Sequence, residues 1–123
     1  MIKLVLDVSA VAAYAEGRTL DVGDLIEQVV DEGNEFAVPL LCLAEAGHQA
    51  KSLEVFARLR ILAGHPHGVI VAPPGDWELL ADAGRVYGSV VAGVVATVAR
   101  ANRGAYVVTT NPDAYEPLPT IGI

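Results

Sequence analysis

Four polar side chains that could bind a metal ion each come shortly after an apolar run: Asp7, Glu45, Asn111 and Asp113. Short runs of this kind favour strands buried in a parallel sheet. The carboxyl ends of such strands meet at one edge, where open α/β sheets bind their ligands. Carboxylates gathered there repel one another unless a cation joins them, which favours Mg²⁺ or Mn²⁺ and a metal-activated water. The spacing predicts a hydrolytic metal site, although Asp7 alone has the simpler interpretation of a helix cap.

The elements that must position these residues alternate between strands and pairs of helices. The predicted strands cover residues 2–6, 36–38, 69–71 and 106–109, with a possible edge strand over 120–123. Helices are predicted over 10–14 after Ser9 as N-cap, over 21–30, over 40–62 as one long or two abutting helices, from 76 to a break at 84–88, and over 90–103. This order predicts an α/β fold with a mainly parallel sheet of four to five strands and helices on both faces.

Composition limits the classes of function. A chain of 123 residues fits one domain, residues 1–123. With 53% hydrophobic and 19% charged residues, it has apolar surface to spare for a partner or a homodimer, unless abundant Ala and Val merely inflate the apolar fraction. The net charge of −7 argues against strong sequence-independent binding of nucleic acid. Any RNA would have to be held locally, by metal and a few arginines.

Cysteine content and hydropathy indicate the compartment. The single cysteine, Cys42, excludes an intrachain disulfide and a cysteine-based zinc site, and its apolar neighbours predict a buried, inert thiol. No apolar run approaches the roughly 18 residues of a membrane span. The leading run is too short for a signal peptide and carries Asp7. These features predict a cytoplasmic protein with no membrane partner.

Three motifs, in order along the chain, resemble those of PIN domains. They are LVLDVSA at 4–10, VPL with LAE within 38–45, and GAYVVTTNPD at 104–113. The resemblance covers almost the whole chain and implies a three-layer α/β/α PIN-like fold. It also implies a metal-dependent endoribonuclease that hydrolyses RNA phosphodiester bonds, close to the VapC-like toxins of bacterial toxin–antitoxin pairs. Mg²⁺ or Mn²⁺ would be the cofactor, RNA the substrate and a cognate antitoxin the protein partner.

The resemblance also implies roles for individual residues. Acidic metal-site positions are matched by Asp7 and Glu45, and the final polar position by Asn111 or Asp113. Asp7, Glu45 and Asp113 would be the catalytic carboxylates. The small hydroxyl residues that support the first carboxylate in the family are matched by Ser9 and Thr109.

One departure from the family pattern gives two further hypotheses. The family has a third aspartate before the last long strand, at a position that falls near Gly93 here, yet no acidic residue lies between positions 83 and 112. Asp82 lies too far upstream to replace it, and Asp113 could compensate in part. The chain is therefore alternatively a catalytically degenerate PIN-like domain that acts as a protein-binding module. A phosphatase or receiver-like domain using Asp7 ranks last, because no second acidic residue adjoins it.

Other candidate residues have plainer explanations. His48 could touch a substrate but is predicted to be a partly exposed helix residue. Lys51, Arg58 and Arg60 could guide RNA or the acidic residues of an antitoxin, with a solvated helix face as the default. Trp77 is expected to pack in the core or in a dimer rather than to stack on a base.

Overall fold

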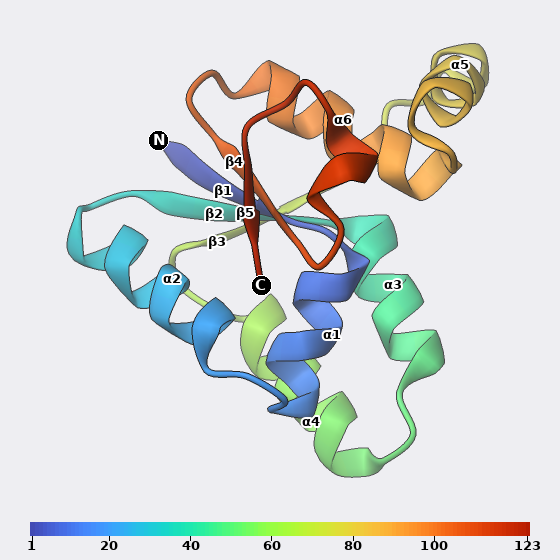
Figure 1. Ribbon diagram of the computed structural model, residues 1–123. Helices are drawn as coiled ribbons and strands as arrows, with labels where there is room; N and C mark the ends of the chain where they lie inside the picture. The colour runs from blue at the N-terminus through green and yellow to red at the C-terminus, as the bar shows by residue number, and fades with distance from the viewer.

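Five short strands form one parallel sheet in the computed structural model, which describes residues 1–123 (Figure 1). The strands are β1 (Ile2–Leu6), β2 (Glu35–Pro39), β3 (Gly68–Val71), β4 (Tyr106–Thr109) and β5 (Thr120–Gly122). They lie in the order β3-β2-β1-β4-β5, and every neighbouring pair is parallel. The predicted α/β class and the C-terminal edge strand are confirmed, and the sheet is parallel throughout.

Helices cover both faces of this sheet. They are α1 (Val8–Glu16), α2 (Asp21–Asp31), α3 (Leu40–Gln49), α4 (Leu53–Ala63), α5 (Trp77–Tyr87) and α6 (Val90–Ala101), followed by the 3-10 turn η1 (Pro112–Tyr115). Figure 1 shows α1 to α4 on one face and α6 on the other, where α6 packs against β1, β2 and β4. This arrangement is the expected three-layer α/β/α fold. The region 40–62 forms two helices, because Ser52 caps a second one.

The centre of the core is β1, which places Asp7 at the sheet edge. Val5 lies between Ala37 of β2 and Val107 of β4, and all three side chains are fully buried. Burying an aliphatic side chain of this kind contributes about 1.5–3 kcal/mol. Because β1 is covered on both faces, its apolar run continues without alternation until Asp7, where the sheet ends.

The predicted break at 84–88 between α5 and α6 is confirmed. Helix α5 continues to Tyr87, and the break lies at Gly88, whose φ is +89°. A Cβ on Gly93 would lie 2.7 Å from the backbone of Ala83 and 2.8 Å from that of Gly84. The two helices cross at 99° in close contact. The glycines in this region therefore allow helix packing, and only Gly88 serves the turn.

Helix α6 ends two residues earlier than predicted. The helix ends at Ala101, before the predicted end at Arg103, and the side chain of its C-cap Asn102 donates to the Val98 carbonyl at 2.8 Å.

No single helix is both long and apolar enough to cross a membrane. Only α5 and α6 taken together, across their sharp bend, reach that length and composition.

Candidate functional site

A pocket of about 380 Å³ opens at the carboxyl ends of β1 and β4. Two helices begin there, α1 with Asp7 as N-cap and α6 with Ser89 as N-cap. The turn after β4 and the last turn of α3 complete its wall. The predicted site residues that line it are Asp7, Ser9, Thr109 and Asn111, joined by Gln49, Ser89 and Tyr115. The fold thus brings together the start and the end of the chain at the predicted edge.

Protein donors surround the Asp7 carboxylate, which is only 7% exposed. Its Oδ1 accepts hydrogen bonds from the Ser9 hydroxyl at 2.6 Å and from the backbone N–H of Ala10 at 3.0 Å. Its Oδ2 accepts one from the Tyr115 hydroxyl at 3.1 Å. The interpretation of Asp7 as the helix cap is confirmed, and that of Ser9 is wrong, because α1 begins at Val8. Ser9 lies inside the helix, and its hydroxyl donates to Asp7.

The two supporting hydroxyl residues have different partners. Ser9 contacts Asp7 directly and also accepts from the Thr110 N–H at 3.0 Å, which ties α1 to the turn after β4. Thr109 is buried, and its Oγ1 accepts from the Asn111 N–H at 3.0 Å rather than contacting Asp7. Thr109 therefore shapes the turn that presents Asn111 to the pocket.

The other predicted carboxylates do not line the pocket. Glu45 lies in the middle of α3, and its Oε1 accepts a hydrogen bond from Gln49 Nε2 at 3.0 Å. Gln49, one turn further on, reaches the pocket wall instead. Asp113 lies in η1 and is exposed, outside the lining. The structure therefore brings Asp7 together with Asn111, and leaves both Glu45 and Asp113 outside the lining.

Gly93, near which the family's third aspartate would fall, is buried at the helix crossing, where no side chain fits. Ser89 lines the pocket, and its Oγ accepts from the Ala92 N–H at 3.0 Å. Sequence reasoning missed Ser89, although a serine directly before an apolar run is an N-cap signal. It also missed Tyr115, for which the sequence carries no signal.

The donor set in this pocket does not fit a catalytic metal centre. A carboxylate offers about four lone pairs, and protein donors occupy three of those on Asp7. Asp7 is the only carboxylate in the lining, and no three His, Cys, Asp or Glu side chains gather anywhere in the chain as a metal-binding group. Mg²⁺ prefers open carboxylate oxygens and octahedral geometry. The pocket is built instead as a satisfied hydrogen-bond network.

Two buried groups beside Asp7 keep their protons. Burial, then the charge of Asp7 and the hydrogen bond to it, raise the pKa of Tyr115, so its hydroxyl remains a donor. Burial, with a smaller contribution from the charge of Asp7, raises the pKa of Cys42 to about 12. The thiol is fully buried, as predicted, and its raised pKa makes it a poor nucleophile.

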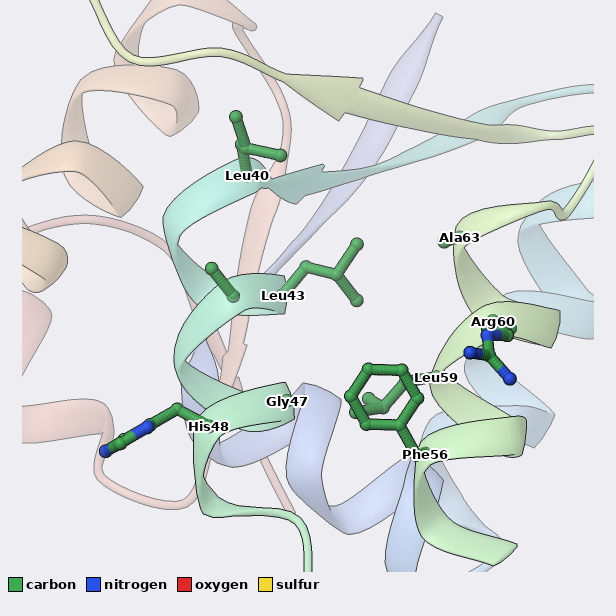
Figure 2. Close-up of a pocket in the computed structure, with 9 residues that line it drawn as sticks. Leu40, Leu43, Gly47, His48, Phe56, Leu59, Arg60 and Ala63 are labelled. Atoms are coloured by element: carbon green, nitrogen blue, oxygen red, sulfur yellow. The ribbon is translucent and has the colours of Figure 1, made fainter. Parts of the chain in front are cut away.

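A second cavity, of about 490 Å³, lies between α3 and α4 (Figure 2). Leu43 and Phe56 face each other across it, with Leu59 behind the Phe56 ring. Gly47 lies on the α3 side of the cavity, where a Cβ would make an ordinary contact with the Phe56 ring at 3.6 Å. We call this cavity the α3–α4 groove. Its lining is mainly apolar, and Phe56 is 41% exposed, so the groove is an unfilled apolar surface.

The cationic side chains near this groove differ in their partners. Arg60 places its guanidinium 5.0 Å from the centre of the Phe56 ring and forms no ion pair within the chain. Arg58 pairs with Glu54 at 2.8 Å and donates to the Ala15 carbonyl at 3.2 Å. Arg58 therefore fastens α4 to α1, whereas Arg60 is available to an outside carboxylate.

No protein-family model matches the chain, and no curated protein matches it either. The resemblance to PIN domains therefore depends on the three sequence motifs alone.

Proposed function

We propose that this protein is a PIN-like domain of the toxin–antitoxin type that acts by binding a partner protein rather than by cutting RNA. The parallel sheet and the strand-Asp-x-Ser arrangement support the PIN-like assignment. One observation carries the non-hydrolytic assignment: Asp7, the only carboxylate in the pocket, has protein donors on both oxygens. Metal-assisted phosphodiester hydrolysis needs carboxylates free to hold the ion that activates water.

The α3–α4 groove supports the binding role. An amphipathic helix can insert apolar side chains into a groove of this kind, and Leu43 and Phe56 supply its walls. Arg60, unpaired in a chain of net charge −7, favours an acidic side chain on the incoming segment. The proposed partner is a cytoplasmic antitoxin-like protein whose docking segment carries apolar residues beside an Asp or Glu.

A second surface supports a homodimer. Helix α5 packs almost entirely against α6 and lies at the periphery of the molecule in Figure 1. It carries two large apolar side chains that are exposed, Trp77 (74%) and Val86 (70%). The exposure of Trp77 rules out packing in the core and fits the other expected place, an interface between two copies.

The test of the binding role uses two variants in cells. The chain is expressed with and without the protein encoded beside it, and growth and co-purification are measured. Asp7→Asn should leave both unchanged. Phe56→Asp should abolish co-purification, because it puts a charge into the apolar groove. Leu53→Asp, on the same helix but 91% exposed and outside the groove lining, is the matched control. Loss of the growth effect in Asp7→Asn, together with RNA cleavage by the unaltered chain, would reject the proposal.

A Mg²⁺- or Mn²⁺-dependent endoribonuclease is the second candidate. The hydrogen bond between Glu45 and Gln49 favours it, because it holds a second carboxylate one turn from the pocket wall. This candidate predicts RNA cleavage by the purified chain that requires added Mg²⁺ or Mn²⁺. Both Asp7→Asn and Glu45→Gln would abolish that cleavage.

A further inference from the structure

Tyr115 reaches Asp7 from a rigid support. It lies in η1, 108 residues away in sequence, and is only 4% exposed. Its ring packs against that of Tyr87, with 6.4 Å between centroids, and Arg100 in turn contacts Tyr87. Because η1 also packs against β4, β5 and α6, the Tyr115 hydroxyl is held in place by its surroundings. It donates to Oδ2, the only Asp7 oxygen that is not already engaged by the helix cap.

Ser89 occupies the same role at α6 that Asp7 occupies at α1. Each is the N-cap of its helix, each accepts a backbone N–H three residues ahead, and both line the pocket. Aspartate caps helices as well as serine does. Folding of α6 therefore does not require a hydroxyl at position 89, and a carboxylate there would face the pocket while still capping the helix.

We infer that Tyr115 and Ser89 together make this pocket metal-free: the Tyr115 hydroxyl occupies Asp7 Oδ2, and Ser89 stands where a second carboxylate would face it. Two substitutions would reverse both features. Tyr115→Phe removes the hydroxyl and keeps the ring that packs on Tyr87. Ser89→Asp adds a carboxylate and keeps the cap. This inference deepens the proposed non-hydrolytic function and rests on it.

The experiment measures Mn²⁺ binding by electron paramagnetic resonance, which reports free Mn²⁺ directly. The full chain is compared with Tyr115→Phe, Ser89→Asp and the double variant. The double variant should bind Mn²⁺ about 10- to 100-fold more tightly than the unaltered chain, the range that changes around a metal site commonly produce. Adding Asp7→Asn to the double variant should remove the gain, which locates the ion. Circular dichroism and a thermal melt verify that each variant is folded.

Mn²⁺ affinity distinguishes this inference from a purely structural role for Tyr115. If Tyr115 only packed against its neighbours, Tyr115→Phe would change the melting temperature and leave Mn²⁺ binding unchanged. A folded double variant that binds Mn²⁺ no better than the unaltered chain would overturn the inference and leave the proposed function standing. Tight Mn²⁺ binding by the unaltered chain, displaced by Asp7→Asn, would overturn both.

Discussion

Replacing Asp7 by Ala should destabilise the folded protein by about 1.5–5 kcal/mol. Loss of an N-cap costs about 0.5–2 kcal/mol, and the α1 cap is the Asp7 Oδ1 contact with Ala10. The substitution also leaves the buried Tyr115 hydroxyl without its acceptor, and an unsatisfied buried donor costs about 1–3 kcal/mol. Ser9 is only half-buried and keeps Thr110 as a donor, so it adds little. The sum is a large share of the roughly 5–15 kcal/mol that stabilises a typical domain.

Urea unfolding followed by circular dichroism measures this loss, with two controls. Asp7→Asn keeps an oxygen that can cap α1 and should cost about 1 kcal/mol. Asp113→Ala, at an exposed carboxylate with no side-chain partner, should change the free energy of unfolding by less than about 0.5 kcal/mol.

The opposite result would refute the reasoning. Carboxylates kept for function often reduce stability, so that their removal stabilises the protein. If Asp7→Ala proved as stable as the unaltered chain, or more stable, the Asp7 network would not be structural. The pocket would then be a binding site that the protein maintains at a cost in stability.

Three further predictions concern the helix crossing, the dimer and pH. Gly93→Ala should destabilise by about 1–3 kcal/mol in urea unfolding, because its Cβ would lie 2.7 Å from the Ala83 backbone; Gly75→Ala, where a Cβ meets nothing, is the control. Val86→Asp should convert a dimer to a monomer in light scattering without lowering the melting temperature, and an unaltered mass would contradict the α5 interface. Stability should fall as the pH rises above 9.0, because an unfolded Cys42 thiol ionises near this ordinary pKa while the folded one keeps its proton to about 12. Between pH 9 and 10, below the ordinary pKa of Tyr115, Cys42→Val should flatten that slope in urea unfolding, and an unchanged slope would assign the effect to other groups.

Local patterns in the sequence were sufficient for the strands and for the edge where Asp7 lies. An apolar run that ends in a polar residue marks both the strand and its carboxyl end, and β1 and β4 followed this rule. The sequence left the N-cap of α1 open between Asp7 and Ser9, because both residue types are good N-caps and only the backbone distinguishes them. The break after α5 lies within the predicted range at Gly88, but the sequence did not show that Gly84 serves close helix packing instead of the turn.

Which residues line the pocket depends on contacts between distant parts of the chain, and no local sequence pattern predicts these contacts. Glu45 and Gln49 lie one turn apart on the same side of α3, so the sequence did not decide which of them would reach the pocket. The Tyr115–Asp7 hydrogen bond joins the two ends of the chain and exists only after the sheet has formed. These contacts, rather than the motifs, favour a binding module over a nuclease.

The most direct test of this account is a thermal melt of the unaltered chain with and without Mg²⁺ or Mn²⁺. The ion is added at about 100 times the Kd that a functional metal site would have. A pocket whose only carboxylate is already satisfied should show no change in melting temperature. Binding to the folded state at that concentration would add about 2.7 kcal/mol, which raises the melting temperature of a domain of this size by about 10 °C. A rise of that size, absent in Asp7→Asn, would contradict the central claim.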